Sequence, residues 1–179
     1  MTVEETYLKG SYIISPKIYK DSRGYFLEGY NEKKFQDLTG LRVAFVQDNQ
    51  SKSSKGVLRG LHFQAGEFAQ AKLVQVITGS VLDVIVDLRK DSKTFGQQFS
   101  IVLDDKKKQQ LYVPKGFAHG YSTLSDEAII VYLQSDNYNA DFDDSIDPLS
   151  LNISWKVSSP ILSEKDKNSI NFEDFNSKF

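Results

Sequence analysis

Residues 72–88, KLVQVITGSVLDVIVDL, decide the fold class of this chain. Two runs rich in β-branched residues, 72–77 and 81–88, predict a pair of strands. Thr78-Gly79-Ser80 separates them, and so short a turn predicts a hairpin between the two. This stretch therefore indicates a β-sheet protein.

The same pattern of short apolar runs between turn residues continues in both directions. Further strands are expected at residues 11–15, 24–28, 43–49, 56–63, 97–103, 109–113, 117–124 and 128–134. Ser125-Asp126-Glu127 predicts a second hairpin, and the charged stretches 104–108 and 141–147 predict loops. About nine or more strands in one domain favour a sandwich or a barrel, and the pattern alone does not choose between them.

Two short helices are expected among the strands. The first has Asn31 as its N-cap and Gly40 as its C-terminal stop, with Phe35 and Leu38 on one face. The second begins at Ser163, where Ser163-Glu164-Lys165-Asp166 resembles a capping box.

Length and composition narrow the class of protein. The 179 residues predict one domain, and a formal net charge of −2 does not indicate nucleic-acid binding. The absence of cysteine excludes disulfide scaffolds, cysteine-based zinc sites and thiol nucleophiles. The N-terminus is polar and acidic, and no apolar run is long enough to span a bilayer, so we expect a cytoplasmic protein without membrane contact.

Histidine and arginine are scarce, with two and four copies against eighteen lysines. Both histidines and two of the arginines, Arg23 and Arg59, fall in dense clusters at residues 21–28, 57–64 and 115–121. Strand alternation separates Arg59 from His62, so a bulge at Gly60 is needed to bring both to one face. Each residue also has an ordinary structural interpretation, because a lone histidine is more often structural than catalytic.

Seven segments in fixed order resemble the dTDP-4-dehydrorhamnose 3,5-epimerases. They are DSRGYFLE, FVQDNQS, GVLRGLHFQ, QAKLVQV, DVIVDLR, LYVPKGFAHGY and LSEKD, which together extend from about residue 10 to about residue 168. The resemblance implies an all-β, cupin-like jelly-roll barrel with short peripheral helices. It also implies a single domain over residues 1–179, with a short N-terminal arm and a C-terminal helical tail that packs on the barrel.

The reaction implied by the resemblance inverts carbons 3 and 5 of dTDP-4-dehydro-6-deoxy-D-glucose. Each inversion removes a proton next to a ketone and returns one to the opposite face, which requires a base, an acid and a group that stabilises the enolate. By resemblance His62 is the base, Asp166 its carboxylate partner and Tyr132 the proton donor. Lys72 then lies near the keto oxygen.

The remaining matched positions are implied to bind the nucleotide sugar. Arginine suits a diphosphate, side-chain amides suit a base or ribose, and an aromatic ring suits stacking on thymine. These positions are Arg23, Glu28, Gln47, Asp48, Asn49, Arg59, Lys72, His119, Tyr138, Asp143 and Lys165. The family is homodimeric, and by resemblance the strand bearing Arg23 and Glu28 crosses to the partner's site.

Two features of the chain qualify these expectations. Gln64 stands two positions after His62, where a metal-binding cupin has its second histidine, so we expect no metal or other cofactor. The acidic loop at 141–147 is shorter than in many family members, which leaves the preference for the nucleotide base open.

Two alternative functions remain. One is a single-carbon epimerase or ketoisomerase of a related dTDP-4-keto-6-deoxysugar, and the other is a non-catalytic sugar-binding β-sandwich.

Overall fold

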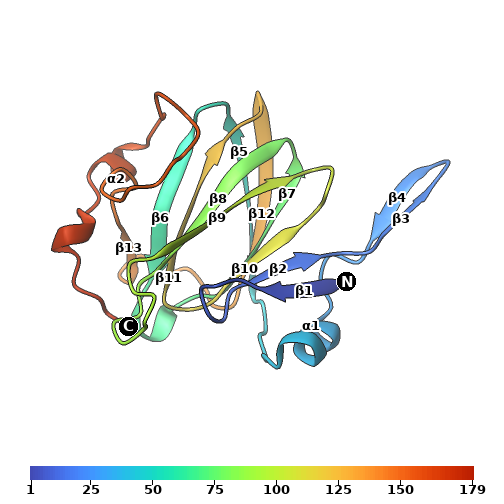
Figure 1. Cartoon of the computed structure of the whole chain (residues 1–179), viewed down its shortest axis with the longest axis horizontal. Helices are drawn as coiled ribbons and strands as arrows, with labels where there is room; N and C mark the ends of the chain where they lie inside the picture. The colour runs from blue at the N-terminus through green and yellow to red at the C-terminus, as the bar shows by residue number, and fades with distance from the viewer.

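Two antiparallel β-sheets face each other in the computed structural model, which describes all residues from 1 to 179 (Figure 1). The six-stranded sheet consists, in spatial order, of β1 (Thr2–Glu5), β2 (Tyr12–Ser15), β10 (Gln110–Val113), β7 (Lys72–Thr78), β12 (Glu127–Gln134) and β5 (Gln47–Ser54). The five-stranded sheet consists of β13 (Asp143–Ser145), β6 (Leu58–Gln64), β11 (Phe117–Thr123), β8 (Ser80–Asp87) and β9 (Gln98–Asp104). The all-β prediction is confirmed.

A separate two-stranded arm and a few short helices complete the chain. The arm is formed by β3 (Ile18–Asp21) and β4 (Gly24–Leu27), and it projects from the body of the molecule (Figure 1). The helices are α1 (Glu32–Thr39), α2 (Glu164–Lys167) and two 3₁₀ turns at Gly66–Phe68 and Phe172–Asp174. None of the helices has the length and hydropathy needed to cross a membrane.

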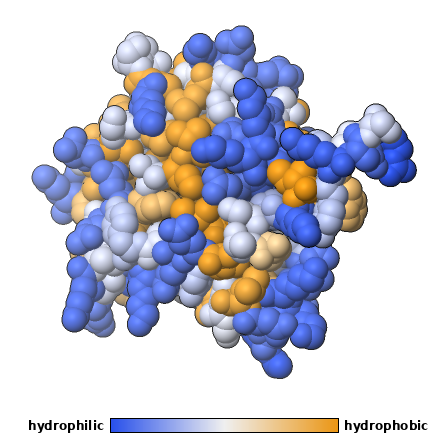
Figure 2. All heavy atoms as spheres, turned by 45° about the vertical axis from the view of Figure 1, so that its right-hand side comes forward, coloured by the Kyte–Doolittle hydropathy of each residue, from blue (hydrophilic) through white to orange (hydrophobic).

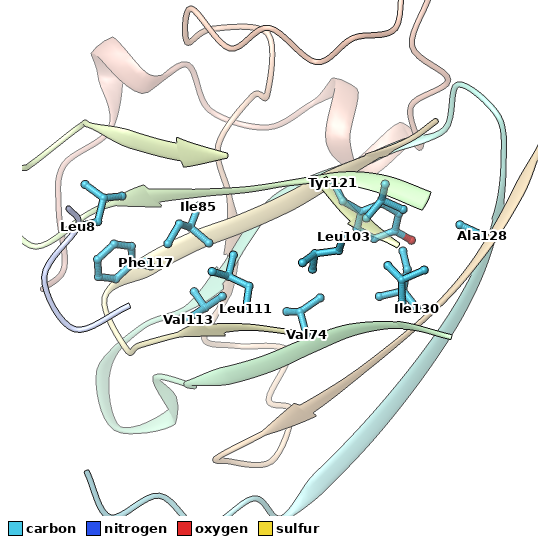
Figure 3. Close-up of a cluster of buried hydrophobic side chains, with 12 residues drawn as sticks. Leu8, Val74, Ile85, Leu103, Leu111, Val113, Phe117, Tyr121, Ala128 and Ile130 are labelled. Carbon is cyan, nitrogen blue, oxygen red and sulfur yellow. The ribbon is translucent and has the colours of Figure 1, made fainter. Parts of the chain in front are cut away.

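The main apolar core lies between the two sheets, as Figure 3 shows. Val74, Leu111 and Ile130 point into it from the six-stranded sheet, and Ile85 and Phe117 meet them from the other. Two further clusters cover the outer faces, one under the C-terminal segment that carries Trp155 and one under α1. Because β8 is therefore buried on both faces, its sequence is an almost continuous apolar run.

The two predicted hairpins are wrong, although the strands beside them are present. β7 and β8 belong to opposite sheets, and so do β11 and β12. Gly79 turns the chain from one sheet to the other with a φ of 80°. Hydrogen bonds from its N–H to Asp105 and from the Ser80 N–H to Ser125 hold that turn. The short turns thus join strands that face each other across the core, as a closed jelly roll requires.

Other boundaries differ at polar segments. The strand expected at 43–49 begins at Gln47 and continues through a polar stretch to Ser54, where pairing with β12 supplies its ladder. The acidic stretch expected to be a loop contains β13, which pairs with β6. Strands β1 and β3 were not predicted, since both are rich in charged or polar residues.

Both predicted helix starts are confirmed by their caps. The Asn31 side chain accepts a hydrogen bond from the Lys34 N–H, and Ser163 accepts one from the Asp166 N–H. Phe35 is buried as expected, but Leu38 is 52% exposed, because the outer cluster takes only one side chain from so short a helix. The expectation that Leu38 packs beside Phe35 is therefore wrong, whereas the helix itself is present as predicted.

A buried carboxylate at the end of β8 provides a stability prediction. Burial raises the pKa of Asp87, but hydrogen bonds from Arg89, Ser92 and Thr94 outweigh it and bring that pKa to about 2. A lowered folded-state pKa adds stability above about pH 4, and this stability is lost as the pH falls through about 2. We expect Asp87→Asn to lower the free energy of unfolding at pH 7 by about 2–4 kcal/mol in urea titrations.

The matched control is Asp126→Asn, because the Asp126 side chain is fully exposed and its one ion pair, with Lys55, is long at 3.8 Å. It should change the free energy of unfolding by less than about 0.5 kcal/mol. The difference between wild type and Asp87→Asn should shrink between about pH 4 and pH 2. A difference that stayed constant over this range would contradict the role of the ionised carboxylate.

Candidate active site

A pocket of about 170 Å³ lies between the two sheets and is lined by half of the positions matched by resemblance. His62 lines it from β6 in one sheet, and Lys72 and Tyr132 line it from β7 and β12 in the other. Of the positions matched by resemblance, its lining includes Asn49, His62, Lys72, Tyr132, Tyr138, Asp143 and Lys165.

A histidine–carboxylate pair forms one wall of the pocket. Asp166 Oδ1 lies 2.6 Å from His62 Nε2, and the Asp166 side chain is almost completely buried. Burial raises the pKa of Asp166, but hydrogen bonds with His62 and Ser163 outweigh it, so the pKa lies below its usual range. The carboxylate is therefore ionised at neutral pH and orients the ring, while His62 Nδ1 has no protein partner.

The expected bulge in β6 brings Arg59 and His62 to the same face. Arg59 pairs with Tyr121 and His62 with His119, so two residues of β6 stand opposite Gly120 alone. Gly60 has a φ of 126°, and a Cβ atom there would lie 2.5 Å from Gly120 Cα. Only glycine therefore allows the close contact between β6 and β11 on which the bulge depends.

The opposite wall holds an amine and a phenol. Lys72 is 7% exposed, and its Nζ lies 3.3 Å from the His62 carbonyl oxygen. Burial lowers the pKa of Lys72 to about 8, although the carboxylates of Asp143 and Asp83 partly oppose this. Burial raises the pKa of Tyr132, so its phenol is protonated at neutral pH. A cation and a neutral proton donor thus face His62.

His119 forms a second histidine–carboxylate pair deeper in the core. Its Nε2 lies 3.0 Å from Asp83 Oδ2, and both side chains are buried. The His119 ring meets Tyr132 edge-on with 6.4 Å between ring centroids. Asp83 was missed in the sequence, although an acidic residue inside the apolar run of β8 was the signal for it. No group of three or more acidic or histidine side chains is placed to hold a metal ion.

Polar contacts connect the segments around the rim of the pocket. Lys165, next to Asp166 on α2, forms an ion pair with Asp143, which also accepts a hydrogen bond from the Tyr138 hydroxyl. Gln47 and Asn49 lie on one face of β5 and are hydrogen-bonded to each other. Five of the positions expected to bind the nucleotide, Gln47, Asn49, Tyr138, Asp143 and Lys165, therefore lie at the rim of the pocket or beside it.

Comparison with known proteins identifies the family. A family model described as dTDP-4-dehydrorhamnose 3,5-epimerase matches residues 5–174. This chain belongs to the dTDP-4-dehydrorhamnose 3,5-epimerase family. A relative of that name from Shigella flexneri is 47% identical over 176 residues, which cover 97% of each chain.

Solved structures agree with the family and with its fold. A dTDP-4-dehydrorhamnose 3,5-epimerase from Elizabethkingia anophelis is 51% identical and has a TM-score of 0.94, with 98% of each chain covered. A dTDP-6-deoxy-D-glucose-3,5-epimerase from Legionella pneumophila, in complex with dTDP-4-keto-L-rhamnose, is 42% identical with a TM-score of 0.94. That match covers 98% of this chain and 94% of the other. The predicted cupin-like jelly roll is confirmed.

Seven matched positions of this epimerase-family chain lie outside the lining of the pocket, namely Asp166, which pairs with His62, the buried His119, Gln47, Arg59, Asp48, Arg23 and Glu28. Arg59 lies near the pocket, where it donates to Ser53 and lowers the pKa of Tyr132 slightly. Asp48 points away on the exposed face of β5. Arg23 is at the tip of the arm, where its only partner is Asp21, and Glu28 pairs with Lys34 at the base. Within one chain, the arm residues do not reach the pocket.

Proposed function

We propose that this chain is a dTDP-4-dehydrorhamnose 3,5-epimerase that inverts both carbons next to the ketone of its substrate. The observation that carries the proposal is the placement of a base and an acid on opposite walls. His62 belongs to the five-stranded sheet and Tyr132 to the six-stranded sheet, and both line one pocket. An inversion needs this separation, because the proton leaves one face of the carbon and arrives at the other.

Each inversion then takes two proton transfers. His62 Nδ1 accepts the proton next to the carbonyl, the C–H electron pair forms a C=C bond, and the C=O π pair moves to the keto oxygen to give an enolate. The Lys72 ammonium stabilises that oxygen, and Asp166 stabilises the imidazolium. Tyr132 donates its phenolic proton to the opposite face of the carbon, and solvent restores both groups. The steps need no redox change and no external electron acceptor.

Solvent-exchange measurements test the proposal against both alternatives. The protein is dialysed against a strong chelator, because the proposed steps use no metal, and is then incubated with dTDP-4-keto-6-deoxyglucose in deuterated water. Deuterium at carbons 3 and 5 with formation of the L-sugar supports the proposal. Deuterium at one carbon supports a single-carbon epimerase. Binding without exchange at either carbon supports a sugar-binding protein, and loss of exchange after chelation contradicts the metal-free mechanism.

The pKa of Lys72 predicts the alkaline limb of the pH profile. Because that pKa is about 8, the amine is charged below this pH and neutral above it. We expect kcat/KM to fall as the pH rises through about 8, since a neutral amine stabilises the enolate less. In Lys72→Arg the fall near pH 8 should disappear, because a guanidinium stays protonated there. A wild-type profile that stays flat between pH 7 and 9 would contradict this role.

We propose that a second copy of the chain completes the site, because the two copies exchange their β3–β4 arms. Phe26 and Tyr25 on the arm are 68% and 57% exposed, which is unusual for aromatic side chains of an isolated protein. Figure 2 shows the arm projecting from the body, with apolar side chains gathered on the body beside it. Gln110 is buried at the base of the arm, where its Nε2 donates a hydrogen bond to the Gly29 carbonyl. Its Oε1 has no hydrogen-bond partner within the chain. A homodimer would bring Arg23 and Glu28 to the partner's pocket.

Mixing two inactive variants tests the exchange of the arm. Arg23→Glu places a carboxylate where the diphosphate is expected, and His62→Ala removes the base. Each homodimer should be nearly inactive, whereas a heterodimer has one site with His62 and an intact partner arm. After unfolding and refolding the mixture, about a quarter of wild-type activity should return. If the arm acts on its own chain, every site in the mixture lacks one of the two groups and no activity returns.

Three further properties belong to the same proposal, namely a single domain, a cytoplasmic location and the absence of a cofactor. Residues 1–179 form one domain, which the shared core between the sheets and the C-terminal segment covering β6 and β8 support. The enzyme works in the cytoplasm and uses no cofactor. The cysteine-free composition supports the location, and Gln64 in place of a second histidine two positions after His62 supports the absence of a metal.

A further inference from the structure

The loop that carries Tyr138 is fastened by the side chains of three glutamines. It connects β12 to β13 (Figure 1). Tyr138 itself is 58% exposed and lines the pocket. Gln47 Oε1 accepts a hydrogen bond from the Tyr138 N–H at 2.8 Å. Gln70 Nε2 donates to the Asp136 carbonyl at 2.7 Å. An exposed ring is thus held through its backbone.

Gln64 makes the most extensive of these attachments. Its Nε2 donates to the carbonyls of Asn137, at 3.1 Å, and Phe68, at 2.8 Å. Its Oε1 accepts from the Asn139 N–H at 2.7 Å. The side chain therefore holds the peptide groups on both sides of Tyr138. Gln64 is only 4% exposed, so these bonds are made without competition from bulk water.

Gln134 fixes the orientation of the amide on the other side. Its Oε1 accepts from Gln47 Nε2 at 2.6 Å and from Asn49 Nδ2 at 3.2 Å. Because Gln47 must therefore direct its NH₂ group toward Gln134, its oxygen faces the Tyr138 N–H. The side-chain amides of Gln47 and Gln134 can therefore form these hydrogen bonds in one orientation only. In that orientation Gln47 binds the Tyr138 backbone and holds the loop.

We infer that Gln64 is a positioning residue for nucleotide binding, which acts by holding the Tyr138 ring where it stacks on the base. The inference rests on the proposed function, because it takes the ligand to be a dTDP-sugar. Gln64 shares β6 with His62. The same strand therefore carries the catalytic histidine and the residue that positions the Tyr138 ring. Its side chain contacts neither His62 nor Asp166, however, so the proton transfers do not depend on it.

The test compares Gln64→Met with wild type, since methionine has a similar length and shape but makes none of the three hydrogen bonds. Calorimetry with dTDP should show about tenfold weaker binding, the size expected for loss of one base–aromatic stack. KM for the sugar nucleotide should rise by a similar factor, and kcat should change less than about twofold. Thermal unfolding of each variant checks that the fold is intact.

A double-mutant cycle with Tyr138→Ala separates positioning from a general loss of structure. If Gln64 acts through the ring, Gln64→Met should weaken dTDP binding less than about twofold further in the Tyr138→Ala background. Fully additive effects would overturn the inference. The matched control is Gln98→Met on β9, which removes a glutamine bond to the Asn152 carbonyl far from the pocket. It should leave dTDP binding unchanged.

The outcomes also distinguish this inference from the proposed function. Unchanged dTDP binding in Gln64→Met, with normal binding by wild type, overturns the role of Gln64 and leaves the epimerase proposal intact. A wild-type protein that fails to bind dTDP overturns both. A fall in kcat with unchanged KM would place Gln64 in support of the His62 wall and would likewise overturn the inference.

Discussion

Replacing His62 with alanine is expected to lower the rate of solvent exchange at both carbons by at least about a thousandfold. The other histidine of the chain, His119, lies outside the lining of the pocket, its Nε2 is occupied by Asp83 and its side chain is buried. No second base is therefore placed to take over. The measurement is deuterium incorporation into dTDP-4-keto-6-deoxyglucose, followed at each carbon by NMR.

The variant should still bind dTDP and keep its fold, because the His62 side chain is one-third exposed and contributes no core packing. Asp166→Asn serves as the companion variant. The amide has the shape of the carboxylate and can still bond Ser163, but it lacks the charge that stabilises the imidazolium, so we expect a loss of about a thousand- to ten-thousandfold. Near wild-type exchange in His62→Ala would show that the base has been assigned to the wrong residue.

The sequence was informative about the strands and much less so about their partners. The apolar runs at β7, β8, β11 and β12 predict strands because β-branched residues pack well in sheets. A short turn such as Thr78-Gly79-Ser80, however, is compatible with a hairpin or with a crossing between facing sheets. Only the burial of both faces of β8 decides between them, and that depends on segments distant in sequence.

The candidate site was predicted better than the network that supports it. Alternation along β6 was sufficient to require a bulge at Gly60, which the register with β11 confirms. Nothing in the sequence indicated that Gln64, Gln70 and Gln134 hold the loop of Tyr138. Glutamine is usually a surface residue, and the partners of these side chains are mostly backbone groups. The roles of all the candidate site residues remain predictions, and Asp48, Arg23 and Glu28 lie away from the pocket of their own chain.

Tyr132→Phe is expected to separate proton removal from inversion. The variant keeps His62, Asp166 and Lys72, so the enolate can still form and His62 can return a deuteron to the face from which it took the proton. We therefore expect deuterium to enter the starting sugar with its configuration retained. Formation of the inverted product should fall by about a hundred- to ten-thousandfold, because the phenol that donates a proton to the opposite face of the carbon has been removed.

The matched control is Tyr112→Phe, which removes another buried phenol hydroxyl from the same sheet. Tyr112 belongs to the cluster on the outer face of that sheet and does not line the pocket, so this variant should invert the substrate like wild type. Inversion and exchange that fall together in Tyr132→Phe would mean that the phenol helps to form the enolate. Inversion that persists at the wild-type rate would mean that the second proton comes from another group, and His119, edge-on to Tyr132, is then the residue to replace.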